Sequence, residues 1–371
     1  MIRRIVGVLF GAALLSVATA QPATAQPAAA QTPGDQAAAP PAAPPPRVAF
    51  TFPPVKPTGP MAPADHIAVH GYSLEGNLEG NSPDRDVEVI LPPSYATDKH
   101  RRYPVIYLLH GFAISGQYFA DFIHAREAVL KSAEKGVEFI VVVPDTETRQ
   151  GGSMYSSSPT TGDFQAFVAK DLVAYIDSHY RTIAKRASRG LAGHSMGGYG
   201  VWTIGMKYPQ VWSSLYAENA CCISPRTETV EEAKRISEAP FKDSATADFG
   251  TRAALASAVA WSPAPDKPPY YADFAYKDGA IDPLVIAKWA ANSPLAMVPQ
   301  YIPALKSFTA IGVGAGDKDG LLADDTAIHD ELDRFGIPNE FTVYEGGHAD
   351  HIAQQFEETV LPFFARRLTM K

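Results

Sequence analysis

Five consecutive residues, Gly193 to Gly197, constrain the fold of this chain more than any other feature, because they match the pattern Gly-x-Ser-x-Gly. In that pattern a serine occupies a sharp, strained turn between a strand and a helix, and bulky flanking side chains would collide with neighbouring backbone. The β-rich run Arg189 to Ala192 precedes the pattern, and a helical segment from Met196 to about Lys207 follows it. The sequence therefore predicts a strand, a tight turn and a helix, with the hydroxyl of Ser195 raised clear of a sheet.

The rest of the chain alternates between β-rich runs and helical patterns. Several β-rich runs are nearly all apolar, which is typical of strands covered by helices on both faces of a mainly parallel sheet. Apolar residues recur at spacings of three and four from Phe164 to Ile176 and again from Ile328 to Phe335. We therefore expect an α/β fold with a mainly parallel central sheet flanked by helices, in which the first strands are antiparallel. The expected strands are Ile67 to His70, Asp86 to Leu91, Pro104 to Leu109, Phe139 to Val143, Arg189 to Ala192, Trp212 to Tyr216, Phe308 to Val313 and Phe341 to Tyr344.

The N-terminus has the three regions of a secretory signal peptide. Arg3 and Arg4 precede an apolar run from Ile5 to Val17, and small residues follow up to Ala20. We expect cleavage after Ala20, with a site after Ala25 also fitting, and export to the periplasm or the medium. The apolar run is shorter than the roughly 20 residues that a spanning helix needs, so no integral membrane segment is expected after cleavage.

The remaining sequence divides into a tether and one large domain. Residues 21–46 are almost entirely alanine, proline and glutamine, a composition that cannot bury enough apolar surface to fold. Residues 47–371 are expected to form a single large α/β domain. The formal net charge is -8, and it becomes -10 without Arg3 and Arg4, which argues against nucleic-acid or anionic-membrane partners.

Residues 223 to about 300 break the alternation of strands and helices. The segment lies before the last two expected strands, and a structureless loop of that length is improbable in a compact domain. We expect a cap-like insertion near the ends of the strands, where ligands bind in open α/β sheets. It would serve as a lid and specificity surface. The alternative is a segment that packs on the side of the fold and has no role in substrate binding. Its prolines and aromatic residues are Pro263, Pro265, Pro268, Pro269, Tyr270, Tyr271, Phe274 and Tyr276.

Cys221 and Cys222 are the chain's two cysteines, and they are adjacent. No disulfide framework can therefore join distant parts of the fold, and a bridge between neighbours would close a strained eight-membered ring. We expect two buried thiols. They are too few for a zinc site, and Asp350 and His351 beside His348 find no matching ligand spacing elsewhere, so no metal or cofactor is expected.

A serine nucleophile needs a histidine to accept its proton and a carboxylate to hold that histidine. In folds with this serine turn the acid and then the histidine follow in loops after later strands. We predict His348, in the glycine-flanked loop after Tyr344, as the general base, with His351 as a rival that belongs at the start of the last helix. Asp317 and Asp319 both lie in the loop after Val313, and their position alone leaves the choice open. Asp324 and Asp325 follow as acids of a first helical turn.

An oxyanion hole requires two backbone amides aimed at the developing negative charge. We assign one to Met196, which follows the serine, and the other to Phe112 in the loop after the strand ending at Leu109. His110 in that loop is expected to brace the backbone by hydrogen bonding. His194 is expected to pack or orient rather than to react.

Several motifs together resemble one family, and they are residues 81–87, 91–95, 103–112, 189–198 and 346–348. They look like the putative-esterase family of α/β-hydrolases, which includes esterase D, feruloyl and acetylxylan esterases, and mycolyltransferases of the antigen 85 type. The resemblance implies an α/β-hydrolase fold and a serine carboxylesterase with Ser195, an acid and His348 as its triad. In similar sequences the acid ends a Gly-x-x-Asp motif before Gly-Leu, which favours Asp319 over Asp317. The resemblance is weakest between about 223 and 300.

The leading hypothesis is hydrolysis of a small-molecule or carbohydrate-linked carboxylic ester through an acyl-enzyme on Ser195. One alternative is acyl transfer, in which a carbohydrate hydroxyl replaces water as the acceptor. Another is a non-catalytic glycan-binding module on a hydrolase scaffold. Tyr155 and Trp202, with the aromatic residues of the insertion, hint at an aromatic or extended apolar acyl group, the alternative being that such residues belong to the core.

Overall fold

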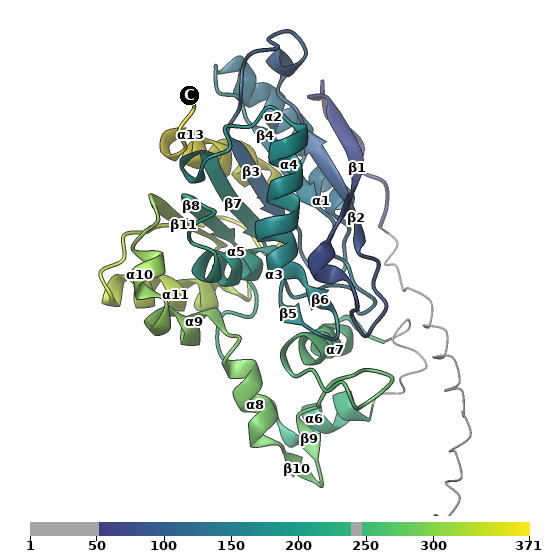
Figure 1. Ribbon diagram of the computed structural model, residues 1–371. Coiled ribbons are helices and arrows are strands. Elements are labelled where there is room, and N and C mark those ends of the chain that lie inside the picture. The colour runs from purple at the N-terminus through teal and green to yellow at the C-terminus, as the bar shows by residue number, and fades with distance from the viewer. Residues whose placement is uncertain (1–51, 239–246) are drawn as a thin grey trace, which may run out of the picture. The chain divides into compact units, whose positions relative to one another are not determined.

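The computed structural model describes residues 52–238 and 247–371 (Figure 1). The expected signal peptide, residues 1–20, and the expected tether, residues 21–46, lie outside the described residues, so both stay predictions.

The centre of the fold is an eight-stranded sheet. β1 pairs antiparallel with β2, β2 pairs antiparallel with β4, and all the other neighbours are parallel. Each of the eight expected β-rich runs corresponds to one of these strands, which confirms the predicted mainly parallel sheet and its antiparallel start. The strands, in order across the sheet, are β1 (Ala64–His70), β2 (Asp84–Ile90), β4 (Ile140–Pro144), β3 (Val105–Leu109), β7 (Arg189–His194), β8 (Ser214–Glu218), β11 (Ala310–Gly316) and β12 (Glu340–Tyr344).

Helices cover both faces of the sheet because its central strands are apolar on both sides. In β3, Val105, Tyr107 and Leu109 join one buried core, whereas Ile106 and Leu108 join a second core on the opposite face. The first core is covered by α3 (Phe164–Ala166), α4 (Val173–His179), α5 (Met196–Lys207) and α11 (Leu322–Arg334). The second is covered by α1 (Gly116–Phe122), α2 (Ala125–Glu134), α12 (Ile352–Gln355) and α13 (Leu361–Arg367).

Shorter elements connect these layers. π-helical turns at Phe167–Leu172 and Phe356–Val360 join α3 to α4 and α12 to α13. Single 3-10 turns lie at Tyr72–Leu74, Pro93–Tyr95 and Arg186–Ser188, and a small two-stranded ribbon pairs β5 (Ser157–Ser158) with β6 (Gly162–Asp163).

The described part of the segment from residue 223 to 300 folds into helices and a hairpin. Figure 1 shows α6, α7, α8 and the β9–β10 hairpin gathered as one group, whereas α9 and α10 contact α5. α7 also contacts β5, and its Trp261 donates an indole hydrogen bond to Ser156 at 3.1 Å. The elements are α6 (Val230–Ser237), α7 (Phe249–Trp261), β9 (Tyr276–Lys277), β10 (Ala280–Ile281), α8 (Pro283–Ala290), α9 (Pro294–Met297), a 3-10 turn at Val298–Gln300 and α10 (Ile302–Leu305).

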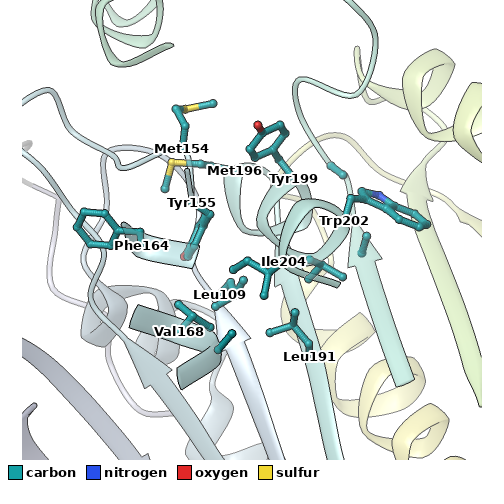
Figure 2. Close-up of a cluster of buried hydrophobic side chains, with 14 of the residues drawn as sticks. Leu109, Met154, Tyr155, Phe164, Val168, Leu191, Met196, Tyr199, Trp202 and Ile204 are labelled. Carbon is teal, nitrogen blue, oxygen red and sulfur yellow. The ribbon is translucent and has the colours of Figure 1, made fainter. Parts of the chain in front are cut away.

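Two aromatic side chains suggested as part of an acyl-binding surface belong to the core instead. Tyr155 and Trp202 have no exposed surface. Figure 2 shows both in a cluster of buried side chains between α5 and the strands, with Leu109, Leu191 and Ile204. The suggestion that they line the substrate site is therefore wrong, because bulky aromatic residues fill this interior.

Candidate active site

Ser195 occupies the turn between β7 and α5 in a strained backbone conformation, with φ 58° and ψ -118°. Gly193 and Gly197 are required because a larger residue at either position would collide with the backbone. A Cβ atom on Gly193 would lie 2.4 Å from the carbonyl oxygen of Gly197, and one on Gly197 would lie 2.1 Å from the carbonyl oxygen of Leu109. Both distances are shorter than any real carbon–oxygen contact, so only glycine fits. The predicted strand, turn and helix are therefore present, and the half-buried serine projects from the turn.

His348 lies between Ser195 and a carboxylate. Its Nε2 is 2.9 Å from the Ser195 hydroxyl oxygen, and its Nδ1 is 2.8 Å from Oδ2 of Asp319. Asp319 is nearly buried, at 8% exposure, and its Oδ1 accepts the amide hydrogen of Leu321 at 3.0 Å. These contacts form an uninterrupted line from carboxylate to imidazole to hydroxyl, as a serine nucleophile requires.

Asp317 takes a different position from Asp319. It is exposed, and its Oδ1 accepts the backbone amide hydrogen of Gly346 at 2.9 Å. Its own amide donates to the carbonyl of Tyr344 at 2.8 Å. The structure therefore brings Asp319 to the imidazole of His348, while Asp317 ties the acid loop to the histidine loop.

The backbone of His348 is held by two donors. Its carbonyl oxygen accepts hydrogen bonds from Nε2 of His194 at 2.7 Å and from Nδ2 of Asn219 at 3.1 Å. Burial, with a smaller effect of the neighbouring His348, lowers the pKa of His194 to about 4, so its ring is neutral near pH 7. With Nε2 donating, the hydrogen of that neutral ring lies on Nε2. His194 therefore orients the histidine loop.

Asn219 is a site residue that the sequence analysis missed. It is fully buried and has a positive φ of 44°. Its Oδ1 accepts the amide hydrogen of Gly316 at 2.8 Å, and its Nδ2 also donates to the hydroxyl of Tyr344 at 2.6 Å. One side chain thus joins the acid loop to the histidine loop. Its place directly after β8, at the edge where the other site loops leave the sheet, was the available signal.

The segment from Glu218 to Cys221 also holds the serine. The amide of Ser195 donates to the carbonyl of Glu218 at 3.0 Å, and the amide of Cys221 donates to the carbonyl of Ser195 at 3.1 Å. Burial raises the pKa of Glu218 to about 8, so its side chain stays protonated at neutral pH. This segment, which we call the β8 strut (Glu218 to Cys221), contacts all three loops of the site.

Asp325 has a structural role in addition to its place in a first helical turn. It lies in the first turn of α11, as predicted for an acid near the positive end of a helix dipole. However, it is fully buried, and its Oδ1 accepts the amide hydrogen of Ala220 in the β8 strut at 3.2 Å. Burial raises the pKa of Asp325 well above its usual range. The residue anchors the strut to α11.

The two amides expected to bind an oxyanion flank Ser195. Met196 is the first residue of α5, where backbone N–H groups have no partner within the helix. Phe112 follows Gly111, and a Cβ atom on that glycine would lie 3.4 Å from the Ser195 Cβ. Within residues 52–238 and 247–371, neither the Met196 nor the Phe112 amide hydrogen-bonds to an acceptor. Both therefore stay available to a substrate oxygen.

His110 braces this loop, as its position suggested. Its Nε2 accepts the amide hydrogen of Thr146 at 2.8 Å, so its Nδ1 carries the proton and donates to the carbonyl of Gly111 at 2.7 Å. Complete burial lowers the pKa of His110 and favours this neutral form.

Aromatic and sulfur-containing side chains lie beside the expected oxyanion site. The ring of Phe112 meets the ring of Phe249, from α7, edge to face at 5.4 Å between centroids. A Cβ atom on Gly152 would lie 2.6 Å from the sulfur of Met196 and 2.7 Å from the Phe112 ring. Phe249 is 60% exposed. Two aromatic rings, one of them from the segment 223–300, therefore pack together at the residue expected to supply an oxyanion amide.

The described residues contain no group of three or more His, Cys, Asp or Glu side chains placed to hold a metal ion. His351 is exposed at the start of α12, and Asp350 accepts the amide hydrogen of Gly347 at 2.8 Å. Within the same described ranges, no helix has both the length and the apolar character needed to cross a bilayer.

The chain is similar to a known protein family and to curated proteins. The sequence model of the family described as Putative esterase matches residues 82–359, well over half of the chain. An esterase of Mycobacterium tuberculosis is 32% identical over 143 residues, which are 37% of this chain and 29% of that protein. S-formylglutathione hydrolase of Paracoccus denitrificans is 27% identical over 147 residues, 35% of this chain and 49% of that protein. The matched segments thus span less than half the length of these curated relatives.

Solved structures share the fold at lower identity. A ferulic acid esterase superposes with a TM-score of 0.59 and 22% identity, over 83% of this chain and 100% of that chain. A fluorophosphonate-binding serine hydrolase of Staphylococcus aureus superposes with a TM-score of 0.57 and 16% identity, over 83% of this chain and 99% of that chain. The fold is therefore the α/β-hydrolase fold, as expected from the sequence.

Proposed function

The chain belongs to the Putative esterase family, and we propose that it hydrolyses carboxylic esters through an acyl-enzyme formed on Ser195. The observation that carries this proposal is the line of hydrogen bonds from Asp319 through His348 to the serine hydroxyl, with distances of 2.8 and 2.9 Å. The line ends at a hydroxyl on a strained turn, next to two amides that have no acceptor in the part of the chain that the structure describes. Nucleophile, base, orienting acid and oxyanion donors thus meet at one edge of the sheet.

Acylation begins when Nε2 of His348 accepts the proton of the Ser195 hydroxyl as the oxygen attacks the ester carbonyl. Asp319 accepts a hydrogen bond from Nδ1–H of the ring and stabilises the imidazolium that forms. The amides of Phe112 and Met196 donate to the oxyanion of the tetrahedral intermediate. Collapse of the intermediate breaks the bond to the alcohol, which leaves with the proton from His348.

Deacylation repeats these steps with water. His348 accepts a proton from a water molecule, the resulting hydroxide attacks the acyl carbonyl, and the same two amides receive the oxyanion. Loss of the Ser195 oxygen as leaving group, protonated by His348, releases the carboxylic acid and restores the enzyme. A carbohydrate hydroxyl entering in place of water would give acyl transfer, and product analysis with an added sugar acceptor separates the two outcomes.

Substitution of the serine tests the proposal directly. Ser195→Ala should lower turnover of a nitrophenyl acyl ester by about 10⁴-fold or more, because the other members of the line cannot replace the nucleophile. Ser178→Ala, at an exposed serine in α4, is the matched control and should keep full activity. Unchanged circular dichroism would show that both variants fold. Turnover retained by Ser195→Ala would contradict the proposal.

The acyl group is proposed to be apolar. The support is the pair of rings of Phe112 and Phe249, which pack edge to face at the loop expected to supply one oxyanion amide. A panel of acetyl, longer alkyl and aromatic acyl esters, compared by kcat/KM, would measure how much these rings contribute to specificity.

We also propose that the enzyme acts outside the cytoplasm. The support is the sequence pattern of Arg3, Arg4 and the apolar run Ile5 to Val17. Expression of the full chain in a bacterial host, followed by N-terminal sequencing of the exported protein, should give a start at Gln21 or Gln26. An uncleaved chain in the cytoplasm would contradict export.

A further inference from the structure

The two adjacent cysteines differ from the buried thiols expected from the sequence. Both Cys221 and Cys222 are partly exposed, and both are unbridged. Their Sγ atoms lie 3.0 Å apart, which is closer than two sulfur atoms approach without a specific interaction. The side chains therefore point toward each other at a partly open position.

The backbone supports this arrangement. Cys222 has a positive φ of 62°, so the chain turns sharply at this residue and the two side chains are brought to the same side. A disulfide bond is about 2.05 Å long, so the sulfurs need to approach by only about 1 Å to form one. The other described elements need not move for this to happen, because the bridge would close within one dipeptide.

We propose that Cys221 and Cys222 form a reversible redox modification site that closes to a disulfide between neighbouring residues. The oxidant is a low-molecular-weight disulfide. One cysteine thiolate attacks a sulfur of that disulfide and releases the first small thiolate, which takes up a proton. The second cysteine then attacks the mixed disulfide and releases the second small thiol. Two cysteine thiols and one small disulfide are thus converted into one protein disulfide and two small thiols.

Cys222 is the better placed attacking group. The hydrogen bond between the two sulfurs, with a further contribution from the guanidinium of Arg226, lowers the pKa of the Cys222 thiol. The same hydrogen bond and burial raise the pKa of Cys221. Cys222 is therefore the thiol that ionises more readily, and its thiolate makes the first attack.

The bridge would be easily reduced. Ordinary disulfides join residues whose Cα atoms are about 4.4 to 6.8 Å apart. Neighbouring residues are held about 3.8 Å apart by a trans peptide bond, so their bridge is strained. Strained disulfides have more oxidising potentials than structural ones and are the labile, regulatory kind. This site is therefore suited to switching and not to permanent cross-linking.

The location connects the site to the proposed catalytic serine. The amide of Cys221 donates to the carbonyl of Ser195 at 3.1 Å, and Cys221 is the last residue of the β8 strut. Ring closure would twist the peptide that follows this amide and shift its hydrogen bond. A misplacement of reacting groups by about 1 Å lowers turnover by as much as 100-fold, so we expect the oxidised form to be slower. This consequence rests on the proposed esterase function, whereas formation of the bridge does not.

Mass and thiol measurements test the site without relying on activity. The folded full-length protein is incubated with oxidised glutathione, separated from it, and analysed by intact mass spectrometry and thiol titration. We expect the loss of two hydrogen atoms, no titratable thiol in the denatured protein, and full recovery of both thiols with reduced glutathione. Ser195→Ala should oxidise in the same way, so failure of the esterase proposal stays distinguishable from failure of this one.

Single substitutions provide the controls. Cys221→Ser and Cys222→Ser each leave one thiol. Each variant should therefore form a mixed disulfide with one glutathione and no bridge within the chain. In an esterase assay, oxidant should slow the wild type reversibly and leave the Cys221→Ser/Cys222→Ser double variant unaffected. Two thiols that persist in the wild type after oxidation, or a stable mixed disulfide with glutathione, would overturn the proposal.

Discussion

The edge of the sheet that carries Ser195 and the segment from residue 223 to 300 are built in different ways. Residues after β7, β8, β11 and β12 are joined by hydrogen bonds between backbone groups and buried side chains, with Asn219 and Asp319 among them. The described part of the segment 223–300 is held by packing of large side chains such as Trp261 and Trp289, whose indoles each bond one serine hydroxyl, and by ion pairs such as Lys288 with Asp273. The hydrogen bonds of the first region converge on Ser195 and His348, whereas those of the second stabilise the segment itself. We therefore expect substitutions in the first to change turnover and those in the second to change substrate preference.

The largest expected effect separates the two candidate acids. Asp319→Asn should lower kcat by about 10⁴-fold, because an amide cannot hold the imidazole of His348 in the required tautomer. Asp317→Asn, at an exposed carboxylate in the same loop, should lower kcat by less than about 10-fold, since it removes only a charge and leaves an oxygen that can accept the Gly346 amide hydrogen. Steady-state kinetics of both variants give the comparison. Equal losses would contradict the assignment.

The next effect concerns stability and pH. Burial raises the pKa of Glu218 to about 8, so between about pH 4.5 and 8 the unfolded chain releases this proton while the folded protein keeps it. Stability conferred by the neutral group therefore falls as pH rises through this window and levels off above it. Glu218→Gln cannot ionise and should lack this part of the decline, a difference of about 2 to 4 kcal/mol between pH 5 and pH 8.

Urea unfolding at both pH values measures that difference. Other buried acids, including Glu88 with a pKa raised to about 7, contribute equally to wild type and variant and cancel in the comparison. Glu345→Gln, at an exposed carboxylate near His348, should retain the wild-type dependence on pH. A Glu218→Gln variant with that same dependence would show that Glu218 ionises normally in the folded protein.

A smaller effect is expected at Asn219. Asn219→Ala removes the side chain that binds the acid loop and the carbonyl of His348, and leaves those groups without these partners. We expect kcat to fall about 10- to 100-fold with a smaller change in KM, because the loss is of positioning in the transition state. Asn77→Ala is the matched control, since Asn77 makes three similar hydrogen bonds, to Leu74 and Asn81 and to none of the proposed catalytic residues. Equal kinetic effects of the two substitutions would argue against a positioning role.

The smallest effect is expected in the segment 223–300. Phe249→Ala removes the ring that meets Phe112 edge to face, a contact worth about 0.5 to 1.5 kcal/mol. KM for apolar acyl esters should rise by about 2- to 10-fold while kcat changes little. Leu284→Ala, at another exposed apolar residue of the same segment, should change neither. A large fall in kcat for Phe249→Ala would remove the distinction between the two regions.

The sheet could be predicted from the sequence because its signals are local. A run such as Ile140 to Val143 is apolar at every position, and only a strand buried on both faces accommodates it. The turn at Ser195 was equally readable, since the space around Gly193 and Gly197 admits no side chain. Position in these loops also identified His348, whereas the choice of Asp319 required the family resemblance.

Other features depend on contacts between distant residues, which the local sequence does not specify. Asn219 joins Gly316 to His348, and nothing in the residues beside it in sequence indicates those partners. Tyr155 and Trp202 are of residue types that also line substrate sites, but here they fill the interior. The sequence position of Asp325 indicates an ordinary first-turn acid. Only its burial and its hydrogen bond from the Ala220 amide show that it anchors the β8 strut. Residue type gives chemistry, but burial decides whether a side chain packs, positions or binds.

The central claim is that Ser195 is a nucleophile activated by His348. It is tested most directly by treating the folded protein with a fluorophosphonate and locating the adduct by peptide mass spectrometry. The account predicts one covalent adduct, on the peptide that contains Ser195, and no adduct on Ser195→Ala. Absence of labelling in the folded wild type, or undiminished labelling of Ser195→Ala, would contradict it.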